Sequence, residues 1–304
     1  MYFFIVNPSS RSNHGRVVWK SVEKEIKRLH INYKVFFTNF PYHAIKIASK
    51  ICEEPGDKTI VAVGGDGTVN EVINGINDFE KIKFGYIPTG SANDFARGLN
   101  LPVKTKKALE NILYSKNIKD MSIGRMSCSN GTYKFANGCG IGLDAYICAK
   151  ANSSPLKDFF NKFHLGFLTY AIVCIQQIFT FKPLKLTAKI DDKRSITVDK
   201  CFFCAVMNNV CEGGGLRLAP QANPFDDMFD VCIVDGISIP KLICVLPLAF
   251  SGRHTFLKEV TTFRCKKLQI ISDVEMPIHR DGEIDKSVKE LTISMEPRNL
   301  KVIC

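Results

Sequence analysis

The sequence lacks the signatures of several well-known classes of protein. It contains no Gly-Lys-Ser or Gly-Lys-Thr, which excludes a nucleotide loop of the Walker type. Its first residues show neither the basic stretch nor the small-residue cleavage site of a secretory signal, so we expect a cytoplasmic protein. Cys201 and Cys204 form the one C-x-x-C pair, and no second pair completes a zinc site. We therefore expect the 12 cysteines to be free, mostly buried thiols.

The chain has little that suggests a membrane span. Residues 163–181 form a run of 19 without Lys, Arg, Asp or Glu, which is close to spanning length. One histidine and two glutamines interrupt this run, and Lys162 and Lys182 bound it tightly. We therefore expect a buried or interface-lying helix there, and peripheral rather than integral association with membranes.

Acidic residues are in deficit, with 30 of them against 41 basic residues and a formal net charge of +11. Such a surplus favours an anionic partner, which can be nucleic acid, a phosphorylated small molecule or an acidic membrane face. The basic residues are dispersed, and the sequence shows no helix-turn-helix, RNA-binding aromatic motif or zinc module. We therefore expect an anionic membrane surface and no nucleic acid as partner, while the sequence leaves the oligomeric state open.

The length of 304 residues predicts about two domains. Residues 1–118 alternate short apolar runs with helical periods, which indicates a parallel α/β domain. Residues 119–289 show the period of two that is typical of antiparallel strands, as in 184–190, where Leu, Leu, Ala and Ile alternate with polar residues. We expect part of 290–304 to rejoin the first domain, and the active site to lie in the cleft between the two.

The periodicity also predicts individual elements. Apolar residues at one helical face, or continuous apolar runs, identify them. The expected helices cover residues 18–29, 44–52, 69–76, 105–114, 163–181 and 241–250, and the expected strands cover 33–38, 59–63, 84–87, 184–190, 196–198, 201–207, 228–234, 268–272 and 274–278.

The strongest local signal is Gly-Gly-Asp-Gly-Thr at residues 64–68, between a predicted buried strand and a predicted helix. Three glycines in four positions let the backbone turn sharply and approach a ligand without Cβ clashes. The following helix points its free N–H groups into the loop, so the segment is suited to hold phosphate. Thr68 can cap the helix or donate to a phosphate oxygen. Asp66 would repel phosphate by itself, which implies a metal ion or a hydroxyl group as its partner.

A second loop follows the next strand, at residues 88–97 with the sequence Pro-Thr-Gly-Ser-Ala-Asn-Asp-Phe-Ala-Arg. It should lie beside the first loop, because the carboxyl ends of parallel strands share one edge of the sheet. Thr89 and Asn93 supply polar groups, and Asp94 supplies a second carboxylate near Asp66. Two carboxylates beside a phosphate site predict Mg²⁺.

Together these loops resemble the catalytic domain of the diacylglycerol kinase family, in particular its soluble bacterial lipid kinases. The resemblance extends over nearly the whole chain. It includes Asn-Pro at 7–8 with Gly15, residues 137–145, Asn208 with Gly-Gly-Gly at 213–215, Ala-Pro-x-Ala at 219–222, and Asp-Gly-Glu at 281–283. Each segment alone is a weak signal, but their order and spacing are specific.

The resemblance implies Mg²⁺- and ATP-dependent phosphorylation of a lipid hydroxyl, with Asp281 as general base and Glu283 as the second catalytic carboxylate. The ATP-binding residues that it implies are Asn7, Thr38, Gly64, Gly65, Asp66, Gly67, Thr68, Asn70, Glu71, Thr89, Gly90, Asn93 and Asp94. The residues that it implies for a structural Mg²⁺, bound partly through backbone carbonyls, are Asn223, Asp226 and Met228.

The sequence departs from the family pattern at two positions. Asp227 stands where the family has glycine, which puts the structural Mg²⁺ site in question. Ser122 replaces an aspartate that the family places before Gly-Arg, and Asp120 lies two residues upstream.

We expect a lipid kinase that transfers the γ-phosphoryl group of ATP to a lipid hydroxyl, with diacylglycerol as the leading acceptor. Another glycerolipid or a sphingoid base would present the same hydroxyl and apolar tail. An NAD kinase is the alternative enzyme, because its Gly-Gly-Asp-Gly loop resembles residues 64–67. A nucleotide- or nucleic-acid-binding regulator is the non-enzymatic alternative.

Overall fold

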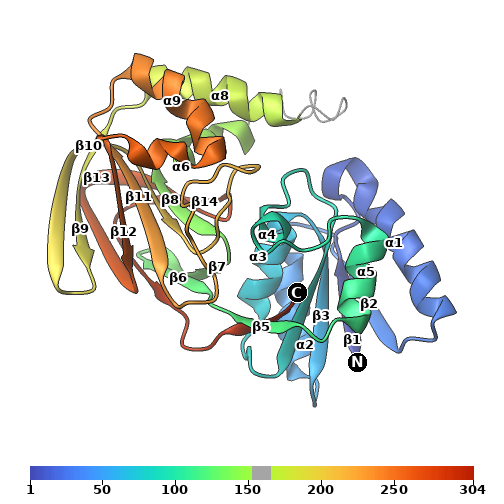
Figure 1. The fold of residues 1–304 in the computed structure, drawn as a ribbon. Helices are drawn as coiled ribbons and strands as arrows, with labels where there is room; N and C mark the ends of the chain where they lie inside the picture. Colours follow the sequence, from blue (N-terminus) through green and yellow to red (C-terminus); the bar gives the residue numbers. More distant parts are fainter. Residues whose placement is uncertain (153–165) are drawn as a thin grey trace. The chain divides into compact units, whose positions relative to one another are not determined.

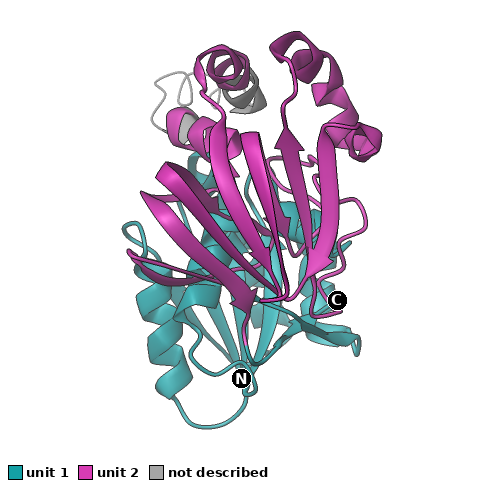
Figure 2. Ribbon diagram, turned by 90° about the vertical axis from the view of Figure 1, so that its left-hand side faces the viewer, with its two compact units in different colours: residues 1–123, 297–304 teal, residues 124–296 magenta. Residues whose placement is uncertain are grey.

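The computed structural model describes residues 1–152 and 166–304 and divides into two compact units (Figure 2). Unit 1 comprises Met1–Ile123 and Pro297–Cys304, and unit 2 comprises Gly124–Glu296. The chain thus leaves unit 1 once and returns to it at its end. Each unit is described by itself.

Unit 1 contains a six-stranded sheet (Figure 1). Its strands are paired in the order β2, β1, β3, β4, β15, β5. Strands β2, β1, β3, β4 and β15 pair in parallel with their neighbours. Strand β5 pairs with β15 antiparallel. The expected parallel α/β architecture is therefore confirmed. The strands are β1 Tyr2–Val6, β2 Tyr33–Phe37, β3 Lys58–Gly64, β4 Ile82–Pro88, β5 Ile118–Met121 and β15 Leu300–Ile303.

The helices of unit 1 bury one face each against this sheet. In α1, residues Val18, Val22 and Ile26 are spaced along one side of the helix and are at most 4% exposed. They pack with strand residues such as Phe4 and Val61 in one hydrophobic cluster, which gives the helix its place on the sheet. The helices are α1 Ser10–Arg28, α2 His43–Glu53, α3 Asp66–Gly75, α4 Asp94–Gly98 and α5 Thr105–Tyr114.

Unit 2 is built on a nine-stranded sheet, all of whose pairings are antiparallel. Its main path runs β12, β11, β10, β8, β13, β14, β6, β7, and β9 pairs with both β10 and β13. The expected β-rich antiparallel domain is therefore confirmed. The strands are β6 Gly124–Cys128, β7 Gly131–Phe135, β8 Gly138–Gly142, β9 Leu184–Ile190, β10 Arg194–Met207, β11 Phe229–Asp235, β12 Val260–Cys265, β13 Lys267–Arg280 and β14 Glu283–Met295.

The helices of unit 2 gather at one end of its sheet, where Figure 1 shows α6, α8 and α9 together. They are α6 Leu143–Asn152, α8 Gly166–Thr180, α9 Ile239–Ser251 and the short 3-10 helix η1 Arg253–Phe256. The helix expected over residues 163–181 corresponds to α8, and its first three residues lie outside the described part of the chain. Among the helices of residues 1–152 and 166–304, none has both the length and the apolar character needed to cross a bilayer.

Two differences from the predicted elements have physical causes. The strands expected at 268–272 and 274–278 are a single strand, β13, whose pairing with β14 shifts register between Ile271 and Met276. The bulge interrupts the alternation of apolar residues, which made one strand look like two. Strand β8 was not predicted, because three of its five residues are glycine, which has a low preference for strands.

Candidate active site

In unit 1 the candidate residues lie where strands β1, β3 and β4 end. The side-chain amide of Asn7, just after β1, donates to the hydroxyl of Thr68 at 3.2 Å. The backbone N–H of Thr89, just after β4, donates to the carbonyl of Gly64 at 2.7 Å. The structure therefore brings together the two loops that the sequence predicted to be neighbours, at the edge where open α/β sheets bind ligands.

Two glycines of the first loop, Gly64 and Gly65, lie in close contacts. A Cβ at Gly65 would lie 3.2 Å from the Cα of Gly90, so the two loops touch backbone to backbone. A Cβ at Gly64 would lie only 2.3 Å from the hydroxyl oxygen of Thr68. Helix α3 begins at Asp66, directly after this contact, so its first N–H groups open at the same edge. The loop has the geometry of a phosphate-binding turn.

Asparagine 93 holds the second loop in shape. It adopts a left-handed conformation with φ 53°, which Asn tolerates better than most residues. Its side-chain oxygen accepts the N–H of Gly90 at 3.0 Å and the hydroxyl of Tyr86 at 3.1 Å. The Tyr86 hydroxyl also lies 3.2 Å from the Gly64 carbonyl, so this ring links the two loops.

The two carboxylates of unit 1 gather at the same place. Asp66 accepts the backbone N–H of Phe95 at 3.0 Å, and Phe95 follows Asp94 in the chain. Burial raises the pKa of Tyr86 well above its ordinary value, and the negative charges of Asp66 and Asp94 raise it further. Arg97 lies 3.8 Å from Asp94. This donor set fits Mg²⁺, which proteins hold with one or two carboxylates together with substrate phosphates.

Three further residues of the predicted ATP site hold elements of unit 1 in place. The carboxylate of Glu71 accepts the N–H groups of Tyr42 and Ala44, both at 3.0 Å, and so caps the start of α2. The side chain of Asn70 is buried and accepts the amide of Asn74 at 3.2 Å. The N–H of Thr38 donates to the Val6 carbonyl at 2.9 Å, which joins the end of β2 to β1.

Ser10 belongs to this site and was missed by the sequence prediction. Its hydroxyl lies 2.6 Å from that of Thr89 and donates to the carbonyl of Asn7 at 3.0 Å. Residues 11–13, which follow it, all have positive φ between 44° and 71°, a conformation that non-glycine residues rarely adopt. A Cβ at Gly15 would lie 2.1 Å from the Asn7 carbonyl oxygen, which explains the glycine of the Asn-Pro…Gly motif.

In unit 2, Asp281 occupies the first position of a tight hairpin turn between β13 and β14. Asp281 and Gly282 have φ of 46° and 81°, as a two-residue turn of type I′ requires. The Asp281 carboxylate accepts three backbone N–H groups, from Ala136 at 2.9 Å, Asn137 at 2.7 Å and Gly138 at 3.1 Å. The carboxylate is therefore held in one orientation by the strand-to-strand connection that precedes β8.

Other segments that carry the family resemblance lie around Asp281. The carbonyl of Asn137 accepts the N–H groups of Asn208 and Asn209 at 2.8 and 2.9 Å. The Asn208 side chain donates to the carbonyl of Ala136 at 2.9 Å, and that of Asn209 to the side-chain oxygen of Asn137 at 3.0 Å. Segments some 70 and 140 residues apart are thus joined around Asp281.

Glu283 is placed differently from what an extended segment would give. In an extended segment it would lie on the same face as Asp281, but the turn at Asp281 and Gly282 separates them, and Glu283 begins β14 opposite Arg280. The reason is that positive φ at two successive residues reverses the chain. Glu283 is partly exposed.

His279 and Glu212 were also missed by the sequence prediction. His279 is 2% exposed, and its ring nitrogens lie 3.3 Å from the carboxylate of Asp144 and 3.4 Å from that of Glu212. Burial by itself lowers the pKa of His279, but the carboxylates of Glu212, Asp144 and Asp281 outweigh it and raise the pKa to about 9. A sequence signal existed, since His279 is a histidine only two positions before Asp281.

The residues predicted for a structural Mg²⁺ make other contacts. The side-chain oxygen of Asn223 accepts a backbone N–H two residues on, at 3.2 Å, and one carboxylate oxygen of Asp226 accepts the N–H of Met228 at 3.1 Å. The other oxygen of Asp226 pairs with the guanidinium of Arg264, which lies 3.4 Å from Asp230. A guanidinium thus lies between two carboxylates here, and the Mg²⁺ site, which the resemblance assigns partly to backbone carbonyls, stays a prediction.

The two departures from the family pattern have visible consequences. Asp227 adopts φ 56°, so the left-handed conformation expected of glycine is kept. Ser122 is 1% exposed, whereas Asp120 is exposed and pairs through its backbone with Lys301 of β15.

Within residues 1–152 and 166–304, no group of three or more His, Cys, Asp or Glu side chains is arranged to hold a metal ion.

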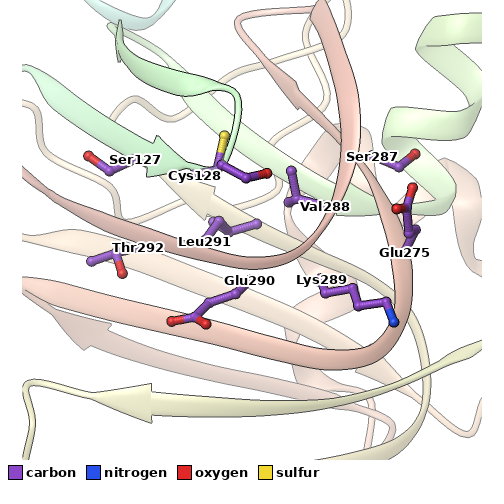
Figure 3. A pocket seen from close by; sticks show the side chains of 10 residues that line it. Ser127, Cys128, Glu275, Ser287, Val288, Lys289, Glu290, Leu291 and Thr292 are labelled. Atoms are coloured by element: carbon purple, nitrogen blue, oxygen red, sulfur yellow. The ribbon is translucent and has the colours of Figure 1, made fainter.

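A separate pocket of about 560 Å³ opens on the sheet of unit 2 (Figure 3). Strands β6, β13 and β14 provide its walls, which include Glu275, Lys289 and Glu290. The residues predicted for catalysis, ATP or metal do not line it. It therefore has no part in the site described above.

Comparison with known proteins agrees with this arrangement. Residues 1–126 match the family model described as the diacylglycerol kinase catalytic domain, and residues 139–304 match that described as the YegS C-terminal NAD kinase beta sandwich-like domain. The YtlR protein of Bacillus subtilis (strain 168), named as a candidate lipid kinase, is 34% identical over 293 residues, with 93% of each chain covered. The chain therefore belongs to the diacylglycerol kinase catalytic-domain family.

Solved structures show the same fold. A diacylglycerol kinase from Bacillus anthracis str. Sterne superposes with a TM-score of 0.71 at 18% identity and covers 99% of this chain and 96% of its own. An NAD kinase from Archaeoglobus fulgidus in complex with ATP superposes with a TM-score of 0.56 at 15% identity, covering 100% and 94%. Membership in this family makes the protein a kinase.

Proposed function

We propose that this protein is an ATP-dependent lipid kinase that phosphorylates a lipid hydroxyl, with diacylglycerol as the leading acceptor. The observation that carries the proposal is the pair of loops after β3 and β4, joined by the contact between Thr89 and Gly64 in a chain of this family. Phosphoryl transfer depends on holding the phosphates, neutralising their charge and placing the acceptor hydroxyl.

Unit 1 would bind the nucleotide. The backbone of residues 64–68, the start of α3 and the hydroxyls of Ser10 and Thr89 offer hydrogen-bond donors to phosphate oxygens. Asp66 and Asp94 would hold Mg²⁺, which neutralises charge on the transferring phosphate. Arg97 would hold Asp94 through its guanidinium.

Unit 2 would supply the base. Asp281 is fixed by three N–H groups and so could accept the proton of a lipid hydroxyl at a defined position. A carboxylate has about four lone-pair sites, which leaves it capacity beyond these three bonds. General base catalysis of this kind contributes roughly 10²–10⁴ in rate.

The defining experiment uses radiolabelled ATP and a panel of acceptors in mixed micelles. Diacylglycerol, a monoacylglycerol, a sphingoid base and NAD are assayed side by side for phosphorylated product. We expect label in a glycerolipid product. Label in NAD alone would favour the second candidate, an NAD kinase-like activity, which the name of the C-terminal family model and the ATP-bound NAD kinase neighbour suggest.

We further propose that the protein acts at an anionic membrane surface. Large apolar side chains are exposed on the neighbouring helices of unit 2: Ile175 and Phe179 of α8, Phe250 of α9 and Phe256 of η1 are 50%, 61%, 56% and 89% exposed. Lys182, Arg253 and Lys258, close to them in sequence, are exposed as well. Apolar side chains with nearby cations suit the boundary between lipid headgroups and acyl chains.

Membrane binding is expected to depend on this patch and on salt. The variant Phe256→Glu should lower the affinity for anionic vesicles at least about tenfold, because burying a Phe side chain contributes about 1.5–3 kcal/mol. Val103→Glu, at a residue of unit 1 that is 58% exposed, is the matched control and should bind normally. Vesicle flotation measures both. Flotation that persists at about 1 M salt, where the Debye length is about 3 Å, would contradict peripheral binding.

A further inference from the structure

His279 connects four separate parts of unit 2. It lies on β13 opposite Gly140 of β8. Asp144, which faces one ring nitrogen, belongs to the first turn of α6, and Glu212, which faces the other, belongs to the connection between β10 and β11. The Asp281 turn begins two residues further along the chain.

The glycines of β8 make room for this cluster. A Cβ at Gly140 would lie 2.1 Å from both the His279 ring and the Asp144 carboxylate. A Cβ at Gly138 would lie 2.8 Å from the Glu212 carboxylate. Alanine at either position would collide with the cluster, so the glycine-rich strand and the buried histidine form one structural unit.

The ring nitrogen Nδ1 of His279 has two competing neighbours. The backbone N–H of Gly282 donates to it at 3.4 Å, and a carboxylate oxygen of Glu212 lies 3.4 Å from it. A protonated Nδ1 donates to the carboxylate, whereas an unprotonated Nδ1 accepts the N–H of Gly282. The two contacts exclude each other, so the proton on His279 decides which neighbour it holds.

We propose that His279 is a positioning residue for the Asp281–Gly282 turn: as an imidazolium held between Asp144 and Glu212 it releases the N–H of Gly282, and on losing the proton at Nδ1 the ring accepts that N–H and constrains the turn. This inference rests on the proposed function, because the proposed function is what makes the Asp281–Gly282 turn part of the catalytic site.

The charged surroundings favour the imidazolium. Asp144, Glu212 and Asp281 all act on the ring, and together they outweigh the burial that opposes the charge, so that the pKa is about 9. The thiols of Cys139, Cys201, Cys204 and Cys232 also interact with the carboxylates of the cluster, and burial raises the pKa of each well above 9.0. The next strand residue, Arg280, contacts Tyr133 and Asp285 instead.

The direct test is a ring-nitrogen NMR titration of the full chain. The protein has six histidines, so comparison with His279→Gln identifies the signal of His279. We expect both ring nitrogens to stay protonated up to a pH of about 9. A ring that titrates near the ordinary value of about 6.5 would overturn the proposal.

The kinetic test uses His279→Gln, because glutamine is neutral and can accept the Gly282 N–H. We expect kcat at pH 7.5 to fall about 10- to 100-fold, the usual effect of losing a group that orients a reactive residue, with the KM for ATP unchanged. The wild type should lose kcat as pH rises through about 9, and the variant should not show this loss. His254→Gln removes another buried histidine of unit 2 and should keep the wild-type profile.

Glu212→Gln separates positioning from a purely structural role. Removing this charge should move the alkaline loss of kcat to lower pH by about 1 to 3 units. An unmoved profile, or loss of thermal stability with unchanged kcat in both variants, would overturn the proposal.

The test separates this proposal from the proposed function. The amide resonance of Gly282 should shift in His279→Gln and stay in place in His254→Gln, whether or not a lipid is phosphorylated. If no acceptor in the panel is labelled, the proposed function fails, while the titration and this shift still judge the positioning of the turn. An unmoved Gly282 resonance would overturn the positioning even in an active kinase.

The stability of the folded chain should depend on the same proton of His279. The pKa of His279 is raised in the folded chain from 6.5 to about 9. A raised pKa means that the contribution to stability is complete below about 6.5 and is lost as pH rises through about 9. The difference in Tm between the wild type and His279→Gln should therefore shrink over this range, as measured by circular dichroism. A constant difference would contradict the assignment of charge to His279.

Discussion

Replacing Asp281 by asparagine is expected to lower kcat by about 10²–10⁴-fold, because the amide cannot accept the proton of the lipid hydroxyl. The same loss corresponds to about 3–5 kcal/mol of transition-state stabilisation. ATP affinity should change little, since the nucleotide loops belong to unit 1. Rates of label transfer to diacylglycerol and calorimetry with ATP measure the two quantities.

The structure adds a cost in stability to this variant. Both oxygens of Asp281 accept backbone N–H groups, and asparagine would turn an N–H toward at least one of them. An unsatisfied buried group costs about 1–3 kcal/mol, so the free energy of unfolding should fall by a similar amount.

Asp191→Asn is the matched control for this effect. Asp191 also has positive φ, at 50°, and its carboxylate accepts the N–H groups of Lys266 and Lys267, both at 2.9 Å. It should lose stability and keep kcat. If Asp281→Asn keeps more than about a tenth of the wild-type kcat, the carboxylate serves only to hold the turn, and Glu283→Gln becomes the variant to examine.

Replacing Gly65 by valine is expected to weaken ATP binding about 10- to 100-fold. A Cβ at this position would lie 3.2 Å from the Cα of Gly90, and the two γ-methyl groups of valine need more space still. Overpacking of this kind costs about 1–3 kcal/mol, which corresponds to that change in Kd. The loops would separate, and the phosphate-binding turn would lose its shape. Calorimetry with ATP measures the Kd.

Two further glycine variants test whether the effect of Gly65→Val on ATP binding is specific to this loop contact. Gly65→Ala adds one methyl group and requires the backbone of Gly90 to shift by only a few tenths of an ångström, so its effect should be smaller. Gly56→Ala lies in a turn with φ 83° and open space around it, so it should reduce stability without changing the Kd for ATP. Unchanged ATP affinity in a folded Gly65→Val protein would remove this loop from the site.

The sequence by itself determined the fold class and the positions of the two loops after β3 and β4. A buried β-branched strand followed by Gly-Gly-Asp-Gly-Thr predicts a strand, a tight turn and a helix start, and all three depend on contacts within a few residues. The family resemblance pointed to Asp281, and its place in a glycine turn after a strand agrees with that assignment. Family resemblance then linked these segments, because their order along the chain is itself a property of the sequence.

Only the tertiary structure decided the partners of these residues. The three N–H groups on Asp281, the capping of α2 by Glu71 and the pairing of Arg264 with Asp226 join segments that are far apart in the chain. Periodicity reports which face of an element is buried, but it does not say which distant group a buried polar side chain meets. For that reason the cluster of His279, Asp144 and Glu212 was invisible until strand pairing placed His279 opposite Gly140.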